Sequence, residues 1–355
     1  MKNENFLKVY KNKKVLITGS TGFKGSWLSF WLHNLGAKVI GVGLKPEDGA
    51  ILYKTLKIDK LIHQYYFDIA NYKKINNLIK KNKPNIIFHL AAQSIVSESY
   101  NNPLKTIESN TLGSANILES TRINKIKNLV YITSDKCYLN VEKNNGYKET
   151  DTLGGYDNYS SSKAAAELIF NSYHHSFFKE NKLKHATARA GNVIGGGDMK
   201  KNRIIPDIIR SLEKNKKILL RNPNSTRPWQ HVLEPLYGYL KLGSYLITKK
   251  LRNLESPNWN FGPYKKNCVK VKKIVGLIHQ KLSIKNKIKT NKKVKFKEAN
   301  LLSLKIDKAK KELKWQPKLT LKETINLTID WYTSYFNNKN MSEFTKSQIE
   351  YFLNK

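Results

Sequence analysis

Tyr159 and Lys163 are two side chains that could together move a proton, and they stand four residues apart. We expect a helix over 157–179, and residues at this spacing share one face of a helix. A neighbouring ammonium lowers the pKa of a phenol because it stabilises the phenolate, so such a pair can remove a hydroxyl proton near neutral pH. Two ordinary surface residues at the same spacing are the alternative, and the surrounding chain must decide.

A second group of reactive residues is Ser134, Asp135 and Lys136, which directly follow the apolar run 128–133. That run is rich in β-branched, aromatic and other apolar residues and predicts a buried strand. A hydroxyl, a carboxyl and an amine in sequence could supply a substrate hydrogen bond, a general acid and a general base. Without further context, a polar turn after a strand explains these residues equally well.

Near the start of the chain, Gly19, Gly22 and Gly25 lie between a short apolar run, 15–17, and a helical pattern over 27–35. Strand, glycine turn and helix together form a cradle for phosphate. Glycines let the backbone approach an anion, and the helix N-terminus offers free N–H groups. A chance glycine cluster would lack the flanking strand and helix. The motif therefore predicts dinucleotide binding, and in this context the tyrosine–lysine pair reads as functional.

Strands and helices alternate through the first half of the chain. We expect further strands over 37–43, 63–67, 85–90, 128–133 and 185–189, and helices over 71–81, 103–122 and 157–179. This alternation predicts an α/β fold with a Rossmann-type, doubly wound parallel sheet covered by helices on both faces. Ligands of such sheets bind at the carboxyl ends of the strands, which is where the reactive residues would meet.

The composition changes at Gly191, after which loops rich in Arg, Asn, Gly and Pro precede further amphipathic helices. We expect the dinucleotide-binding, Rossmann-type domain to span 1–190 and to be completed by 229–263. The segments 191–228 and 264–355 would then form a smaller α/β substrate-binding domain.

The chain has 355 residues and a formal net charge of +37. Nucleic-acid binders carry such a charge. Here, however, the lysines are spread along the whole chain and many stand beside Asn and Ile, which indicates a residue-usage bias on solvated faces. We therefore expect no nucleic-acid partner, although a basic surface would help to gather an anionic ligand.

Other composition features narrow the setting. No run approaches twenty uninterrupted apolar residues, so no membrane span is expected, and 1–14 is too polar for a signal peptide. The two cysteines, Cys137 and Cys268, have neither a CxxC pattern nor metal-ligand spacing. We expect a reduced, cytoplasmic compartment and no metal site.

Seven motifs carry a resemblance to a known family. In chain order, from about residue 13 to 263, they are TGSTGFKGSWL, FHLAAQ, TSDKCY, GYDNYSSSKAAAE, ARAGNVIGGGD, TRPWQHVLEP and NFGP. The chain resembles the extended short-chain dehydrogenase/reductase family and, within it, the sugar-nucleotide 4,6-dehydratases. Most members that act on dTDP-glucose or GDP-mannose carry Asp-Glu after the fifth strand. Members that act on CDP-glucose carry Asp-Lys, as this chain does at Asp135 and Lys136.

The resemblance implies an NAD-dependent lyase that converts CDP-glucose to its 4-keto-6-deoxy product for deoxysugar and surface polysaccharide biosynthesis. Tyr159, helped by Lys163, would take the proton of the sugar 4-hydroxyl while NAD+ accepts the C4 hydride. Ser134 would hydrogen-bond the 4-oxygen. Lys136 would remove the C5 proton and Asp135 would protonate the departing 6-hydroxyl, before the hydride returns to C6.

The resemblance also implies cofactor contacts from the glycine turn, from the ends of the third and fourth strands and from the reactive pair. These residues are Gly19, Thr21, Gly22, Phe23, Lys24, Gly25, Asp68, Ile69, Leu90, Ala91, Ala92, Gln93, Tyr159 and Lys163. Many NAD enzymes place an acid after the second strand to hold the ribose diol. Here Gly43, Leu44 and Lys45 offer none, and Lys45 could even accept a 2′-phosphate. The resemblance decides for NAD, because the hydride must return internally.

Substrate contacts are expected from polar residues after the fourth and sixth strands and from arginines of the second half: Gln93, Asn192, Arg203, Arg221 and Arg227. A guanidinium pairs bidentately with phosphate, which suits the diphosphate of a CDP-hexose. An ordinary surface charge is the alternative for each arginine. We expect a homodimer or a higher homo-oligomer.

Two other functions stay open at this point. A dehydratase or an epimerase for another nucleotide sugar would share the fold and the cofactor, although an epimerase has no need of the Asp–Lys pair. A non-catalytic regulator or nucleic-acid binder on the same scaffold would not need the intact set of Ser134, Tyr159 and Lys163.

Overall fold

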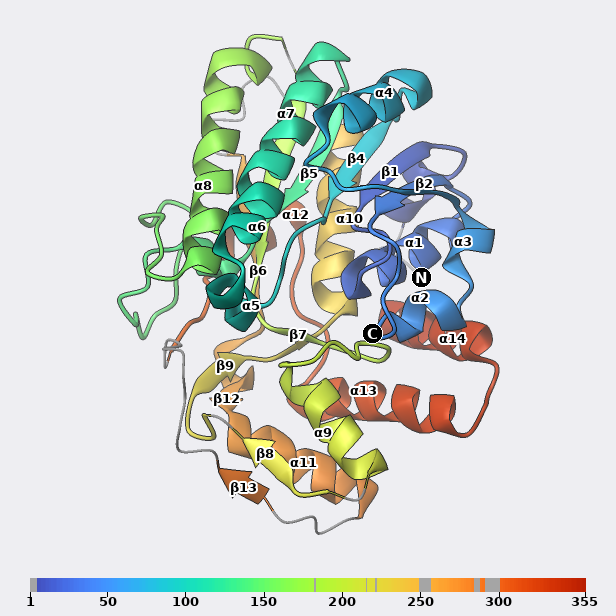
Figure 1. Ribbon diagram of the computed structural model, residues 1–355, viewed down its shortest axis with the longest axis vertical. Coiled ribbons are helices and arrows are strands. Elements are labelled where there is room, and N and C mark those ends of the chain that lie inside the picture. The colour runs from blue at the N-terminus through green and yellow to red at the C-terminus, as the bar shows by residue number, and fades with distance from the viewer. Residues whose placement is uncertain are drawn as a thin grey trace.

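A computed structural model describes residues 5–181, 183–214, 216–220, 222–248, 257–283, 288–290 and 301–355. Arg221, one of the expected substrate contacts, lies outside the described residues. The central strands are β1 (Lys14–Thr18), β2 (Lys38–Gly43), β3 (His63–Tyr66), β4 (Ile86–His89), β5 (Asn128–Ile132), β6 (Lys184–Ala190) and β11 (Asn258–Phe261). They form one parallel sheet in the order β11-β6-β5-β4-β1-β2-β3 (Figure 1).

The described residues also form α-helices. They are α1 (Phe23–Asn34), α2 (Ile51–Thr55), α3 (Ile58–Leu61), α4 (Tyr72–Asn82), α5 (Val96–Asn101), α6 (Pro103–Ile107), α7 (Gly113–Ile123), α8 (Asn158–Tyr173), α9 (Ile204–Glu213), α10 (Leu233–Thr248), α11 (Val271–Leu282), α12 (Asp307–Leu313), α13 (Leu321–Phe336) and α14 (Met341–Asn354). The short strands are β7 (Val193–Ile194), β8 (Ile218–Leu220), β9 (Thr226–Pro228), β10 (Gln230–His231), β12 (Cys268–Lys270) and β13 (Ile288–Thr290).

The sheet has a buried core on each face. Side chains alternate between the two faces of a strand, so on β1 Leu16 and Ile17 belong to different cores. The core around Leu16 is completed by α4, α7 and α8, and the core around Ile17 is completed mainly by α1 and α10. Because β1 pairs with β2 on one side and with β4 on the other, the strand order reverses there. The predicted Rossmann-type sheet is confirmed, and its switch point lies at the end of β1.

Two predicted helices are wrong as continuous α-helices: 157–179 is α8 followed by the π-helical turn His174–Phe178, and 103–122 is interrupted near its middle. The chain forms α6, then the π-helical turn Glu108–Leu112, then α7. The turn points the Asn110 amide inward, where it accepts from the Gln93 N–H at 2.7 Å and donates to the Ser162 hydroxyl at 3.0 Å. A tertiary contact therefore overrides the regular helical period.

A second, smaller group of elements lies below the sheet in Figure 1 and contains α9, β8, β9, β12, α11 and β13. β9 pairs with β12 in antiparallel fashion, and β8 pairs with β13 in parallel.

The helices α9 and α14 were not predicted. The ring centres of Phe352 in α14 and Trp31 in α1 lie 6.2 Å apart in an edge-on arrangement, so the end of the chain packs on the sheet side of the molecule. The proposed domain boundaries stay a prediction. Within the described residues, no helix is long and apolar enough to cross a membrane.

Glu234, at the start of α10, joins this helix to the segment before α13. One carboxylate oxygen accepts from the N–H groups of Lys318 and Leu319 at 2.8 and 2.7 Å. The other oxygen is buried without a hydrogen-bond partner in the described part of the chain. Burial raises the pKa of Glu234 to about 7, although the two N–H groups act in the opposite direction.

We expect Glu234→Gln to remove a pH dependence of stability. The folded pKa is about 7, above the ordinary value of 4.5, so this group's contribution is complete below pH 4.5 and is lost as pH rises through 7. As pH rises between those limits, the free energy of unfolding of the unmodified chain should fall by about 2–3 kcal/mol relative to that of Glu234→Gln. Urea unfolding of both proteins from pH 4.5 to 8 measures the difference. Glu350→Gln, at an exposed position of α14, is the control, and equal pH slopes for all three proteins would contradict the prediction.

Candidate active site

The predicted reactive segments meet at one edge of the sheet. Gly19 follows β1, Leu90 follows β4, Ser134 follows β5 and Asn192 follows β6, so all four leave the carboxyl ends of neighbouring strands. In a parallel sheet these ends lie side by side, and they are where ligands bind. The candidate site is therefore built by turns on a rigid scaffold.

The glycine turn is packed against the chain that leaves β4. Gly19 has φ +73°, and a Cβ atom added there would lie 2.8 Å from the backbone of Ala91. Only glycine fits both the conformation and the approach. Helix α1 begins directly after Gly22, and no side chain caps its first turn. Its N–H groups and the positive end of its dipole are thus available for an anion. Thr21, Phe23, Lys24 and Gly25 complete this turn, which fits a dinucleotide diphosphate.

The other expected cofactor residues border the same turn. The Thr18 hydroxyl accepts from the Ala91 N–H at 3.1 Å and contacts His89 Nδ1 at 2.7 Å. Burial lowers the pKa of His89 to about 3, with Lys163 acting in the same direction, so the imidazole is neutral. Thr18 and His89 position the segment Leu90–Ala92, and sequence reasoning missed both. The available signal was that Thr18 and His89 are polar residues at the ends of otherwise apolar strands, β1 and β4.

Asp68 and Ile69 follow β3. Asp68 accepts from the Ala70 N–H at 3.0 Å and pairs with Lys105 at 2.8 Å, while the Ile69 carbonyl accepts from Asn116 at 3.0 Å. These contacts hold the turn that was predicted to border the adenine.

Gln93 is engaged within its own loop. Its Nε2 donates to the Thr106 hydroxyl and to the Ile95 carbonyl, each at 3.0 Å, and its Oε1 accepts from the Ile95 N–H at 2.5 Å. Both ends of the amide thus hold the loop before α5. The predicted direct role in binding stays a prediction.

The turn after β5 brings a hydroxyl and a carboxyl together inside the molecule. Ser134 donates to Asp135 Oδ1 at 3.0 Å, and these side chains are 8% and 2% exposed. Ser134 also hydrogen-bonds Tyr159, which is 7% exposed in the first turn of α8. Lys136 is partly buried beside them. The structure thus brings Ser134, Asp135 and Tyr159 into one cluster.

Burial sets the proton affinities in this cluster. It raises the pKa of Tyr159 to about 12, although the hydrogen bond with Ser134 and the nearby Arg203 both lower this pKa. Burial lowers the pKa of Lys163 to about 8. Desolvation of the phenolate thus outweighs Ser134 and Arg203, the two groups that lower the tyrosine pKa. The predicted effect of the Lys163 ammonium on the phenol stays a prediction.

Asp135 has the environment of a proton donor. Burial raises the pKa of its carboxyl, and Lys136 acts in the opposite direction. Its Oδ2 is buried without a partner in the described residues and faces Gly191, where an added Cβ would lie 2.9 Å away. An unpaired buried carboxyl oxygen is costly unless it is protonated or meets a ligand.

Lys24 brings a further cation to the cluster. Its pKa is lowered to about 8 by burial first, then by Arg203 and Lys163, while Asp135 raises it. Its Nζ lies 5.9 Å from the centre of the Tyr239 ring. The Tyr239 hydroxyl is buried and has no partner in the described part of the chain. Nothing in the sequence singled out Tyr239, which comes from α10.

The predicted substrate arginines differ in their surroundings. Arg203 pairs with Asp198 at 2.8 Å and donates to the Ser94 hydroxyl at 2.7 Å. Arg227 is 7% exposed and acts on the Asp135 carboxyl, so it lies beside the cluster. The Asn192 carbonyl accepts from the Gln230 N–H at 3.3 Å, which joins β7 to β10.

Among the described residues, no three His, Cys, Asp or Glu side chains are grouped so that they could hold a metal ion.

Comparison with known proteins places these features in a family. Residues 16–328 match the family described as GDP-mannose 4,6 dehydratase. The CDP-glucose 4,6-dehydratase of Salmonella typhimurium is 40% identical over 355 residues, which cover 98% of this chain and 98% of that protein.

Solved structures of low sequence identity share the fold. An epimerase from Methanothermobacter thermautotrophicus is 23% identical with a TM-score of 0.81, over 94% of this chain and 96% of that chain. A dTDP-glucose 4,6-dehydratase from Bacillus anthracis, solved in complex with NAD, is 21% identical with a TM-score of 0.76, over 93% and 98% of the two chains.

Proposed function

The chain belongs to the GDP-mannose 4,6-dehydratase family, and from this premise we propose that it converts CDP-glucose to CDP-4-dehydro-6-deoxyglucose and water. The observation that carries the proposal is the buried cluster of Ser134, Asp135 and Tyr159 at the end of β5, with Lys136 beside it. A hydroxyl oxidation needs a base at the hydroxyl, and a following elimination needs a second base and an acid. The cluster holds all three types.

The first proton transfer is assigned to α8. NAD, when bound, accepts the hydride from C4 of the sugar and returns it to C6. Tyr159 takes the proton of the 4-hydroxyl, and Ser134 holds the 4-oxygen through the hydroxyl that already contacts Tyr159. Lys163 lies one helical turn away and supplies a positive charge in a buried setting.

Water loss is assigned to the turn after β5. Oxidation at C4 acidifies the C5 proton, and Lys136 removes it and gives a proton back to C5 once C6 has been reduced. Asp135 donates a proton to the departing 6-oxygen, a role supported by burial that raises the pKa of its carboxyl and by its unpaired Oδ2. Arg227, beside Asp135, and Arg203 at the start of α9 neutralise the diphosphate of the substrate.

NAD is the proposed cofactor. The glycine turn, the uncapped start of α1 and the segment after β4 fit a dinucleotide, and the hydride is returned in the same cycle, so no exchange with a reductant pool is needed. Gly43 at the end of β2 and the next two residues, Leu44 and Lys45, offer no acid to hold a ribose diol. The preference over NADP therefore rests on the family and on the internal return of the hydride.

The deciding experiment is incubation with NAD and each of CDP-, dTDP- and UDP-glucose and GDP-mannose, followed by detection of the 4-keto sugar and its mass. We expect loss of 18 mass units from the CDP sugar as one water departs. A product of unchanged mass that is inverted at C4 would assign an epimerase instead. If the protein dehydrates only a different nucleotide sugar, the proposed reaction stands but the proposed preference for CDP-glucose is overturned.

We also propose a homodimer in the cytoplasm that serves deoxysugar and surface polysaccharide synthesis. Large apolar side chains are exposed on neighbouring elements: Leu104 of α6 at 80%, Leu112 of the π-turn at 52% and Leu168 of α8 at 57%. α8 packs against both α6 and the π-turn, and α6 and α8 lie side by side in Figure 1. A grouped apolar surface of this kind is typical of an interface between chains.

Leu168→Glu is expected to convert the dimer to a monomer, because a carboxylate at the centre of an apolar interface loses its water without gaining a partner. Size-exclusion chromatography with light scattering measures the mass in solution. Leu219→Glu, on β8 and 51% exposed, is the matched control and should leave the mass unchanged. An unchanged dimer in Leu168→Glu would place the interface elsewhere.

A further inference from the structure

Behind the candidate site lies a buried ion pair to which the proposed reaction assigns no role. Glu167 of α8 and Arg189 of β6 meet through two contacts, Nε to Oε1 at 3.0 Å and Nη2 to Oε2 at 2.8 Å. Their side chains are 0% and 1% exposed. Burying two charges costs several kcal/mol per ion, and apolar replacements of buried pairs are often as stable. Fold stability alone therefore does not account for this pair.

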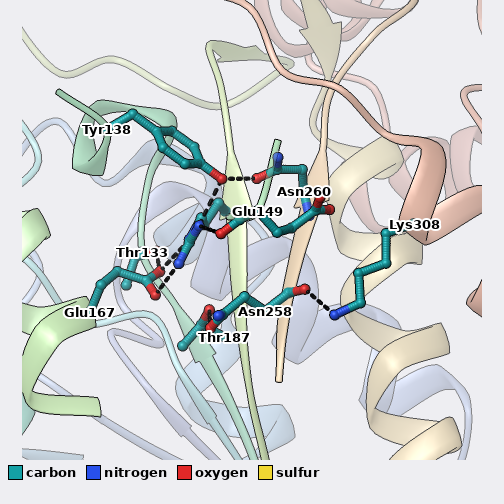
Figure 2. A network of polar contacts seen from close by, with 9 residues as sticks. Thr133, Tyr138, Glu149, Glu167, Thr187, Asn258, Asn260 and Lys308 are labelled. Atoms are coloured by element: carbon teal, nitrogen blue, oxygen red, sulfur yellow. Dashed lines mark hydrogen bonds and ion pairs between the residues drawn. The ribbon is translucent and has the colours of Figure 1, made fainter. Parts of the chain in front are cut away.

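The two partners hold opposite ends of one turn. Thr133 is the residue directly before Ser134, and its hydroxyl donates to Glu167 Oε1. Arg189 Nη1 donates to the Tyr138 hydroxyl at 2.7 Å, at the other end of the turn. Figure 2 shows Thr133 and Glu167 on one side of this network and Tyr138 on the other. The turn between them carries the residues assigned to water loss.

The Arg189 end is fastened to two further elements. Arg189 Nη1 also donates to the Glu149 carbonyl at 3.0 Å, and Tyr138 donates to Asn260 Oδ1 at 2.8 Å (Figure 2). Asn260, on β11, donates through its N–H to the Glu149 carboxylate at 2.9 Å. The far end of the turn is thus tied to β6, β11 and the loop before α8. A network with this many satisfied members has one low-energy arrangement.

The same pair also acts on the helix of the first proton transfer. Glu167 lies four residues after Lys163 on α8, as Lys163 lies four after Tyr159, so all three share a helix face. Burial lowers the pKa of Lys163, while Cys137 and then Glu167 raise it. Lys24 and His89 are the other titratable groups that interact with Lys163. Glu167 thereby connects the charge on Lys163 to the position of the turn.

We propose that the Glu167–Arg189 ion pair is a positioning device that fixes the turn after β5 relative to the proton-transferring face of α8. The proposal rests on the proposed function, because it states how the two halves of that site are kept in register. Displacement of a reacting group by about 1 Å can cost about 100-fold in rate. Loss of the pair should therefore reduce kcat more than it changes KM.

Thr133→Val is the cleanest test, because it removes one hydroxyl contact to Glu167 and leaves both charges in place. We expect kcat to fall by about 10- to 100-fold, with KM and the urea midpoint of unfolding little changed. Hydrogen–deuterium exchange of the 134–138 amides should become faster, since that end of the turn is released. This second readout needs no substrate, so it stands even if the wild-type protein turns over none of the nucleotide sugars.

Glu167→Gln tests the charge, because a glutamine oxygen can still accept from Thr133. Without the carboxylate, the pKa of Lys163 should fall, and the alkaline limb of the kcat profile should move to lower pH. Glu119→Gln removes one partner of the ion pair with Arg122 on α7 and is the matched control. It should change neither the exchange of 134–138 nor the pH profile.

The proposed function and the positioning role can fail independently. If the wild-type protein forms no 4-keto sugar, the proposed function fails, and the exchange experiment alone decides on the positioning role. If Thr133→Val keeps both the wild-type kcat and the wild-type exchange of 134–138, Glu167 does not position the turn through Thr133 and the inference is overturned. If Glu167→Gln does not fold, Thr133→Val still decides.

Discussion

Tyr159→Phe is expected to reduce turnover of the nucleotide sugar by about two to four orders of magnitude, which is the usual cost of removing a general base. The phenol is buried, reaches Ser134 and has its pKa raised to about 12 by burial, so its ionisation depends on neighbouring positive charge. The substitution removes one oxygen and keeps the ring. Packing of α8 and the glycine turn should therefore survive, and calorimetry should still detect NAD binding.

Tyr156→Phe is the matched control for this variant. Tyr156 lies three residues earlier and is 86% exposed, so loss of its hydroxyl should leave turnover unchanged. The two variants thus separate a general effect of tyrosine loss from the role of one phenol. Near-normal turnover in Tyr159→Phe would assign the first proton transfer to another group and would remove the reason for placing Lys163 beside it.

Much of the sheet could be predicted from the sequence because β1, β2, β4 and β5 are short, largely apolar runs between glycine or polar turns. β5, for example, is buried along its whole length, and its neighbours alternate with helices. A parallel sheet then brings the strand ends together without further information. This is why the residues after β1, β4, β5 and β6 could be expected at one edge.

Features that depend on contacts between distant segments were not predicted. Asn110 replaces part of a long helix with a π-turn because it meets Gln93 and Ser162, neither of which lies near it in sequence. Arg189 and Glu167 each stand inside a motif that was noted, but their pairing requires β6 and α8 to be placed first. The pKa of Tyr159 likewise depends on burial, which local spacing does not report.

Lys136→Met is expected to separate oxidation from water loss. The first hydride transfer needs a base at the 4-hydroxyl and a partner for the 4-oxygen, which are Tyr159 and Ser134 in the proposed site. Elimination needs a base at C5, and Lys136 is the amine that the turn after β5 presents there. We expect the variant to oxidise C4 and then stall, with product formation reduced by about two to four orders of magnitude. A single-turnover trace of reduced-nicotinamide absorbance detects the stalled state.

Solvent deuterium exchange at C5 identifies which half of the elimination has failed. In Lys136→Met, C5 should not exchange, because the base is missing. In Asp135→Asn, C5 should exchange while water loss stalls, because the base remains and the acid at the 6-oxygen is gone. Lys148→Met, at an exposed position of the following loop, controls for loss of a positive charge and should react normally. Ordinary C5 exchange in Lys136→Met would show that another residue takes the proton, and the Asp–Lys pair would then no longer support elimination by this site.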